Sequence, residues 1–64
     1  MNLWEFEGKK VRIITKEPGV LGSVFEGTAC DYTDADDNEP EIASICIGDT
    51  EFYENNIKSI EVIE

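Results

Sequence analysis

The stretch KKVRIITK, residues 9–16, decides the fold because its apolar residues recur at every second position. Alternation of this kind is typical of a β-strand that buries one face and exposes the other. We therefore expect a strand over these residues. Its core face carries Val11, Ile13 and Thr15, and its outer face carries Lys10, Arg12, Ile14 and Lys16.

The segment before this strand predicts a short helical turn over residues 3–7. Asn2 followed by Glu5 has the spacing of a capping box, and Gly8 suits a left-handed C-cap. A turn this short is marginal alone, so it needs an apolar contact with the rest of the domain. We expect that contact from Leu3, Trp4 and Phe6.

Four further strands are expected after the first one. Glu17-Pro18-Gly19 has the chemistry of a type II turn, and Gly48-Asp49 has that of a tight hairpin. Gly27 lies inside the second strand, where a glycine usually marks a sharp bend or a bulge. The strands span residues 23–32, 42–47, 50–53 and 57–63, with a corner at residues 54–56.

The chain of 64 residues makes one domain, residues 1–64, with a thin core. Five short, bent strands leave exposed edges in an open sheet, so we expect closure into a small, strongly bent antiparallel barrel of the SH3-like kind. The expected fold class is mainly β with a short N-terminal helical turn. The last strand carries Ile60 and Val62 on one face and Ile57 and Ile63 on the other. Two apolar faces fit either barrel closure or pairing with a neighbouring subunit.

Fifteen acidic residues against five basic ones give a formal net charge of −10. This charge repels phosphate backbones, which Lys or Arg must neutralise, so it disfavours general binding of nucleic acid. Neither a charged-then-apolar leader nor a long apolar run occurs in the sequence. We therefore expect a cytoplasmic protein with no export signal and no membrane contact.

Two cysteines, Cys30 and Cys46, lie inside apolar runs, where a free cysteine behaves as a small buried hydrophobe. If residues 32 and 41 pair across the intervening loop, Cys30 faces residue 43, and a disulfide is out of register. Catalysis is poorly supported because the chain has no histidine and neither cysteine has a base beside it in sequence. We predict no catalytic residue, no cofactor and no enzyme activity.

An acidic segment, residues 31–41, follows the second strand and contains almost nothing apolar, so we expect an exposed loop. Carboxylate and amide oxygens suit calcium. However, a calcium-binding loop that starts at Asp34 places Glu39 where glycine is required and Ile45 where the last acidic ligand is required. We predict no metal site. The segment is then either a solvated loop or a phosphate-mimicking surface that occupies a partner's basic site.

The order of these parts resembles the Sm-like (LSm) family, in which a short helix precedes five strands of a bent barrel and subunits assemble edge to edge. Residues 8–15, GKKVRIIT, resemble the family's first strand. Residues 25–29, FEGTA, with the acidic segment beyond them, are similar to its second strand and the following loop. Residues 55–60, NNIKSI, are similar to the end of the second Sm motif. The chain thus resembles a small bacterial-type member.

The resemblance implies a nucleotide site, but the second motif is degenerate in this chain. RNA-binding members carry a basic residue and a glycine before the Asn-Asn-Ile stretch, where this chain has Tyr53 and Glu54. In the loop after the second strand, Tyr32, Asp34 and Asn38 can stand for the family's aspartate, aromatic residue and asparagine only with a register slip. The candidate contacts to RNA or another ligand are Lys10, Arg12, Tyr32, Asp34, Asn38, Tyr53 and Asn55.

Two groups among these candidates have a second interpretation. The basic stripe of Lys10, Arg12 and Lys16 either contacts phosphates or faces acids on an adjacent strand, since cross-strand pairs of opposite charge stabilise sheets. Tyr32 and Tyr53 either stack on bases or seal an interface between subunits.

We therefore predict a non-enzymatic Sm-like binding and assembly module that forms homo-oligomers and contacts a protein partner of unknown identity. The first alternative is an RNA-binding Sm-like protein with a modified nucleotide site, and the second is an acidic mimic of nucleic acid. The sequence does not indicate the number of subunits. The predicted subunit interface consists of Phe52, Tyr53, Ile57, Ile60, Val62 and Ile63.

Overall fold

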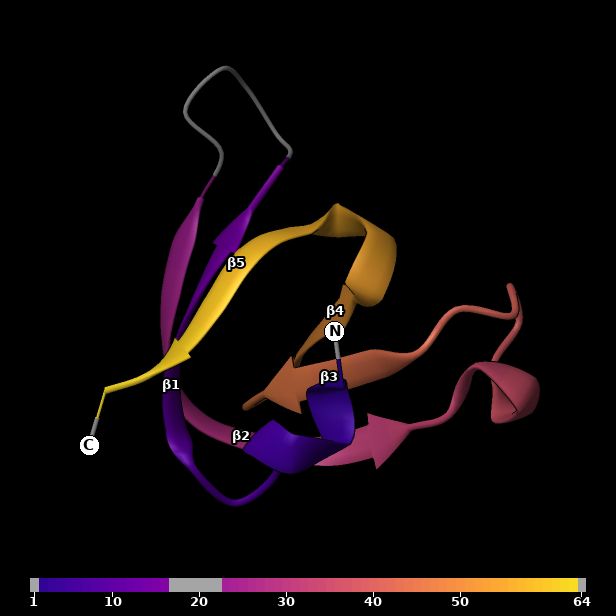
Figure 1. Cartoon of the computed structure of the whole chain (residues 1–64), viewed down its shortest axis with the longest axis horizontal. Coiled ribbons are helices and arrows are strands. Elements are labelled where there is room, and N and C mark those ends of the chain that lie inside the picture. Colours follow the sequence, from indigo (N-terminus) through magenta and orange to yellow (C-terminus); the bar gives the residue numbers. More distant parts are fainter. Residues whose placement is uncertain (1, 17–22, 64) are drawn as a thin grey trace.

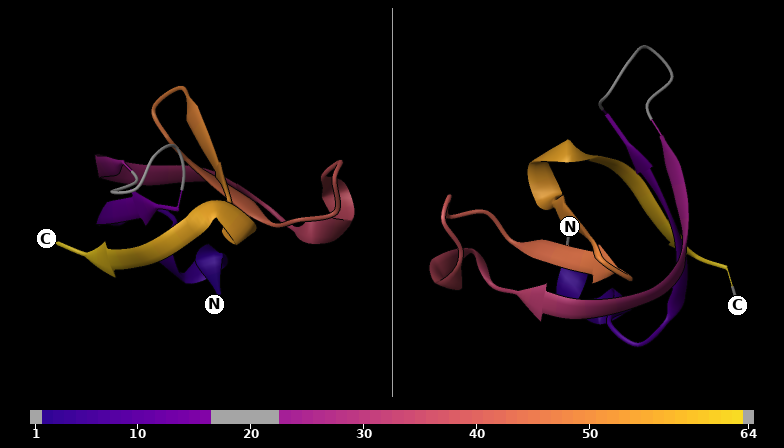
Figure 2. Two further views of the ribbon diagram at one scale, coloured as in Figure 1. Left: turned by 90° about the horizontal axis from the view of Figure 1, so that it is seen from above. Right: turned by 180° about the vertical axis from the view of Figure 1, so that it is seen from behind.

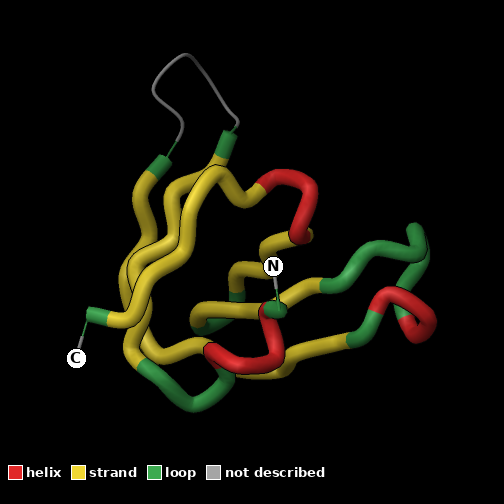
Figure 3. Tube along the Cα trace, in the orientation of Figure 1, coloured by secondary structure: helices red, strands yellow, loops and turns green. Residues whose placement is uncertain are grey.

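The computed structural model of the chain describes residues 2–16 and 23–63 and is mainly β (Figure 1). The predicted turn at Glu17-Pro18-Gly19 lies outside the described residues. The described chain contains three 3-10 turns and five strands. Figure 3 colours the turns and strands along the chain. They are η1 (Leu3–Phe6), β1 (Lys10–Thr15), β2 (Val24–Thr33), η2 (Ala35–Asp37), β3 (Ser44–Ile47), β4 (Thr50–Tyr53), η3 (Glu54–Asn56) and β5 (Ile57–Val62).

The five strands form one antiparallel sheet in the order β4-β3-β2-β1-β5. β2 is the longest strand, pairing with β1 up to Thr28 and with β3 from Ala29 onward. It curves through both halves of the sheet, so the β5-β1-β2 half and the β2-β3-β4 half run across each other (Figure 1 and Figure 2). The predicted five-stranded antiparallel fold is thus confirmed, and its closure into a barrel stays a prediction.

The core contains the predicted inner face of β1. Val11, Ile13 and Thr15 are all buried, because alternate side chains of a strand point to the same side. The ring of Phe25 on β2 meets the ring of Phe52 on β4 edge to face, with centroids 4.9 Å apart, and this contact joins the two halves of the sheet. The buried apolar side chains are Leu3, Val11, Ile13, Ala29, Ile45, Phe52 and Ile57.

The N-terminal turn is confirmed, but its predicted cap and one of its core contacts are wrong. The side chain of Asn2 makes no capping hydrogen bond, so the capping box is not formed. Leu3 is buried and Phe6 packs against the core, whereas Trp4 is 58% exposed. Only residues three apart share a side of a 3-10 turn, which explains why Trp4 points away. Gly8 has a φ of +85°, as a left-handed C-cap requires.

β2 contains a bulge close to its end. Its pairing with β3 shifts register between Cys30 and Thr33, and Asp31 between them has a φ of +52°. The N–H of Tyr32 donates a hydrogen bond to the carboxylate of Glu7 at 3.1 Å. The segment after the N-terminal turn therefore satisfies a donor that the bulge takes out of the strand ladder.

Gly27 does not mark this bulge, because it lies in regular pairing with Val11. Its role is close packing: a Cβ added at Gly27 would lie 2.6 Å from Cγ2 of Ile47 on β3. Only glycine lets the strands β2 and β3 approach each other this closely at this position. Gly27 stands just before the point at which β2 leaves β1 and joins β3.

The pairing of β5 with β1 also shifts register, which changes the predicted faces of β5. Ile14 pairs with Ser59, but the next residue, Thr15, pairs with Ile57. Ile57 is thereby brought onto the core face and is buried, while Ile60 packs half-buried against the same core. The prediction that these two isoleucines lie on opposite faces is wrong, because strict alternation ends at a bulge.

Candidate functional site

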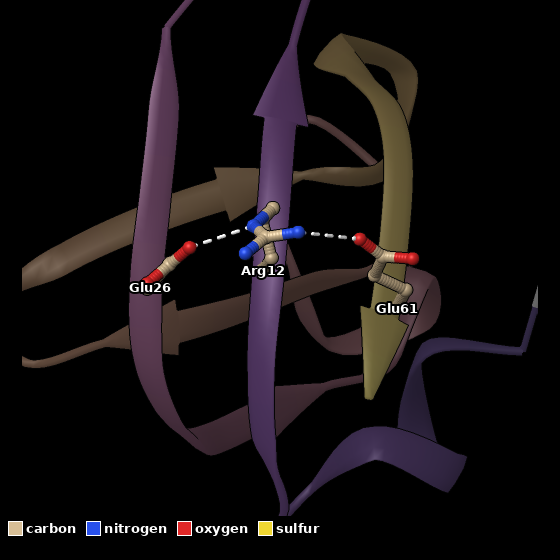
Figure 4. Close-up of polar contacts among 3 residues, drawn as sticks. All are labelled: Arg12, Glu26 and Glu61. Atoms are coloured by element: carbon tan, nitrogen blue, oxygen red, sulfur yellow. Dashed lines mark hydrogen bonds and ion pairs between the residues drawn. The ribbon is translucent and has the colours of Figure 1, made fainter. Parts of the chain in front are cut away.

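Arg12 lies at the centre of three strands on the outer face of the sheet. Its Nε donates a hydrogen bond to Glu26 on β2 at 2.6 Å, and its Nη1 donates one to Glu61 on β5 at 3.0 Å (Figure 4). The hydrogen bond to Glu26 and the charge of that carboxylate, with smaller contributions from Glu61, raise the pKa of Arg12. Cross-strand charge pairing, the second interpretation of the basic stripe, is thus confirmed for Arg12.

Lys10 is exposed on the same face of β1 as Arg12. A phosphate that approached this stripe would meet Glu26 and Glu61, which already bind the guanidinium. These two carboxylates accept from Nε and Nη1 of Arg12 and offset the charge of its guanidinium. The outer face of β1 therefore offers a phosphate less positive charge than the sequence suggests.

Tyr32 and Asp34 are joined directly. The Tyr32 hydroxyl donates a hydrogen bond to Oδ1 of Asp34 at 2.7 Å. This hydrogen bond, followed by burial and the charges of Asp34 and Glu54, raises the pKa of Tyr32 to about 12. The ring is half-buried and packs against the core, so the domain itself already uses part of the surface that could stack on a base.

Asn38 connects the acidic segment to the start of β3 by hydrogen bonds. Its Nδ2 donates hydrogen bonds to the carbonyl oxygen of Ile42 at 2.7 Å and to Oγ of Ser44 at 3.0 Å. Ser44 has no exposed surface although it lies on the side of β3 opposite to the core residue Ile45. The acidic segment is therefore not a fully solvated loop, because its Asn38 contacts a buried side chain of the sheet.

The contacts of Ser44 continue across the hairpin to β4. The Ser44 hydroxyl donates a hydrogen bond to Oε2 of Glu51 at 2.8 Å. The charge of Glu51, followed by burial and a hydrogen bond to the same carboxylate, raises the pKa of Tyr53. We call Asn38, Ser44, Glu51 and Tyr53 the polar network. It joins the acidic segment, β3 and β4 into one hydrogen-bonded surface.

Cys30 and Cys46 lie directly opposite each other on β2 and β3. The predicted register, with Cys30 facing residue 43, is wrong because the bulge at Asp31 and the late start of β3 shift the pairing. Both thiols are free and half-buried rather than fully buried. Burial, followed by the charge of Glu51 and smaller effects of Cys30 and Asp31, raises the pKa of Cys46.

The predicted ligand contacts fall into separate groups rather than one site. A hydrogen bond joins Tyr32 directly to Asp34, whereas Asn38 and Tyr53 are linked through Ser44 and Glu51. The groups are Tyr32 with Asp34, Asn38 with Tyr53 in the polar network, Lys10 with Arg12 on the other half of the sheet, and Asn55, exposed in η3.

Sequence reasoning missed Ser44 and Glu51, although a signal was present. The two-residue turn at Gly48-Asp49 fixes the hairpin register, so that Ser44 faces Tyr53 and Cys46 faces Glu51. No comparable signal links Glu26 and Glu61 to Arg12. The contact with Glu61 depends on the pairing of β1 with β5, which are far apart in the chain, and the contact with Glu26 depends on the register of β1 against β2.

The interface residues predicted on the last two strands differ in how much surface they leave free. Phe52 and Ile57 belong to the core of the chain itself, and Ile60 packs against that core. Tyr53 and Ile63 are half-buried, whereas Val62 is 44% exposed. Val62 thus leaves the most side-chain surface for contact with another molecule.

Among residues 2–16 and 23–63, no cluster of three or more His, Cys, Asp or Glu side chains is arranged to hold a metal ion. None of the helical turns in this described part is long and apolar enough to cross a membrane. Comparisons of the chain with models of known protein families, with curated proteins and with solved structures find no match.

Proposed function

We propose that this chain is a non-enzymatic, Sm-like binding and assembly module that pairs with copies of itself through β4 and β5. The observation that carries the proposal is the strand order, in which β4 and β5 are the two edges of the sheet. An edge strand presents backbone donors and acceptors that another chain can pair with. Different edges on one molecule allow head-to-tail contacts, which close into a ring when the rotation permits.

The backbone groups on β5 that face outward can be assigned from alternation. The N–H of Ile63 donates to the carbonyl oxygen of Lys10 at 2.9 Å, so Ile63 faces β1. The neighbouring residue Val62 then faces away from β1 with its N–H and carbonyl group. Val62 therefore offers both a backbone hydrogen-bonding edge and an exposed apolar side chain.

The same reasoning applies to β4. The N–H of Glu54 donates to the carbonyl oxygen of Ala43 at 2.9 Å, so residue 54 faces β3. Tyr53 and Glu51 then turn their backbone groups to the outer edge. A second copy could add its β5 there by strand pairing. Small domains of this length commonly need such a supplement to their core.

The test is the mass of the purified chain at micromolar concentration, measured by native mass spectrometry and sedimentation velocity. We expect an assembly several times the 7.2 kDa of one chain. A strictly monomeric species would overturn the proposal.

Two variants of one residue test which strand makes the contact. Val62→Pro removes an N–H that faces away from β1 and leaves the hydrogen bonds of the neighbouring residues to β1 intact. An edge strand tolerates proline at such a position. We expect this variant to be monomeric. Val62→Thr keeps the N–H and serves as the matched control, so it should still assemble. If the wild type and Val62→Pro form the same oligomer, association through β5 is wrong.

The two alternatives have their own readouts in the same samples. An RNA-binding protein would associate with single-stranded RNA in a salt-sensitive manner. An acidic mimic would compete with RNA or DNA for a basic partner. Arg12 is engaged by carboxylates, and Asn38 donates its hydrogen bonds within the domain, so self-assembly is the function we favour.

A further inference from the structure

Cys30 and Cys46 face each other across β2 and β3 as a hydrogen-bonded pair. The N–H of Ala29 donates to the carbonyl oxygen of Lys9 at 2.9 Å, so Ala29 faces away from β3. Its neighbour Cys30 then faces β3, opposite Cys46. Their side chains project from the same face of the sheet, because directly opposed residues share a face.

The spacing of such a pair is compatible with a disulfide. Directly opposed residues of a hydrogen-bonded antiparallel pair have Cα atoms about 5.5 Å apart, and disulfides most often bridge Cα atoms about 5.5–6 Å apart. The Cβ atoms of opposed residues stand about 4.5–5.5 Å apart, slightly more than the roughly 3.5–4.5 Å of a relaxed disulfide. The bond must therefore draw β2 and β3 together, and a strained disulfide is readily reduced.

We propose that Cys30 and Cys46 are a reversible oxidation site, at which a small-molecule disulfide of the glutathione type converts the two thiols into a cross-strand disulfide. Both thiols are half-buried rather than enclosed, so a small oxidant can reach them. Neither thiol belongs to the polar network, and neither lies on the edge strands through which we propose assembly. The oxidation proposal therefore does not rest on the proposed assembly, although Cys46 faces Glu51 on the edge strand β4.

The reaction proceeds in two exchanges. The thiolate of one cysteine attacks a sulfur of the oxidant, breaks its S–S bond and releases one small thiol. The thiolate of the opposite cysteine then attacks the protein sulfur of this mixed disulfide and releases the second small thiol. The two protein thiols lose two electrons and two protons, which leave with the two molecules of small thiol.

The neighbourhood of Cys46 sets how this reaction responds to pH. Burial and the nearby carboxylate of Glu51 raise the pKa of Cys46, so its thiolate is scarce at neutral pH. Attack by this cysteine should accelerate as the pH rises toward its pKa, by about tenfold per pH unit, since only the thiolate reacts.

The experiment incubates the reduced, folded chain with oxidised glutathione, quenches with acid and measures the mass of the intact protein. We expect a product lighter than the reduced chain by two hydrogen atoms, with little glutathione adduct, and its reversal by reduced glutathione. Cys30→Ser and Cys46→Ser should each accumulate a single glutathione adduct instead. Accumulation of a doubly glutathionylated wild type, or closure only in the urea-unfolded chain, would overturn the proposal.

A register control separates the opposed geometry from mere proximity. Thr28 lies on the same face of β2, two residues from Cys30, and is exposed. In the double variant Cys30→Ser and Thr28→Cys, the new thiol is diagonal to Cys46 rather than opposite to it. We expect this variant to hold the glutathione adduct at least tenfold longer than the wild type. Equal closure in the two proteins would show that the observed register has no role.

Discussion

The hydroxyl of Tyr32 donates a hydrogen bond to Asp34, and this contact, with burial, raises the pKa of Tyr32 to about 12. Because this folded-state pKa lies above the ordinary value of 10.0, the protonated hydroxyl stabilises the fold fully below pH 10. That contribution is lost as the pH rises through about 12. We expect the midpoint of urea unfolding to fall across this window, and Tyr32→Phe to remove this part of the fall.

The two tyrosines can be told apart by their carboxylate neighbours. Asp34→Asn should lower the pKa of Tyr32 toward 10.0 in an absorbance titration of tyrosinate and leave Tyr53 unchanged. Glu51→Gln should lower the pKa of Tyr53 and leave Tyr32 unchanged, because Glu51 is the first cause of the shift at Tyr53. If Asp34→Asn leaves both titrations unchanged, the hydrogen bond between Tyr32 and Asp34 is absent in solution.

The amide of Asn38 offers a second test on a single side chain. Asn38→Asp removes the side-chain N–H groups that donate hydrogen bonds to Ser44 and to the carbonyl oxygen of Ile42. It also adds a negative charge within the polar network. We expect a loss of about 1–3 kcal/mol in the free energy of unfolding, measured with urea. Asn55→Asp adds the same charge at an exposed position of η3 and should change stability by less than about 0.5 kcal/mol. Equal effects of the two changes would contradict the role of Asn38.

At the scale of the strand, Gly27 determines how closely β2 approaches β3. Gly27→Ala places a Cβ 2.6 Å from Cγ2 of Ile47, a methyl group on a branched Cβ that cannot rotate away cheaply. We expect a loss of about 1–3 kcal/mol in the free energy of unfolding. Ile47→Ala removes the clashing atom, so the double variant should lose less stability than the sum of the single variants. Strict additivity would show that the two residues do not touch.

At the scale of the whole molecule, stability depends on a small core to which the N-terminal turn contributes Leu3. Leu3 is 1% exposed and Trp4 is 58% exposed, although they are neighbours in sequence. Leu3→Ala should cost about 2–5 kcal/mol, a large share of what a domain of this size possesses. Trp4→Ala should cost less than half as much, because most of its surface is already in water. The reverse order in thermal unfolding would place Trp4 in the core instead.

Local sequence patterns predicted the strands well. The alternation in β1 gave the correct buried face, and Gly48-Asp49 gave the correct hairpin between β3 and β4. These predictions succeed because each depends on residues that are close in the chain, so the local backbone preference and the final structure agree. The same hairpin register brings Ser44 and Glu51 within hydrogen-bond distance.

The two bulges account for two of the wrong predictions, the register of the cysteines and the faces of β5. The bulge at Asp31 shifted β2 against β3 and brought Cys30 opposite Cys46. The irregularity between Ile14 and Thr15 brought Ile57 onto the core face. A bulge leaves little trace in sequence, because it forms where the pairing of two strands needs an extra residue.

The amino-acid sequence by itself determined the number, order and approximate bounds of the strands, the buried face of β1 and the acidity of the exposed surface. These features follow from side-chain periodicity, turn chemistry and charge. Only the tertiary structure decided that Arg12 binds Glu26 and Glu61, that Asn38 fastens the acidic segment to Ser44, and that the two cysteines are opposed. These contacts depend on strand register, which is set by how the bent sheet packs around its core rather than by any short stretch of chain.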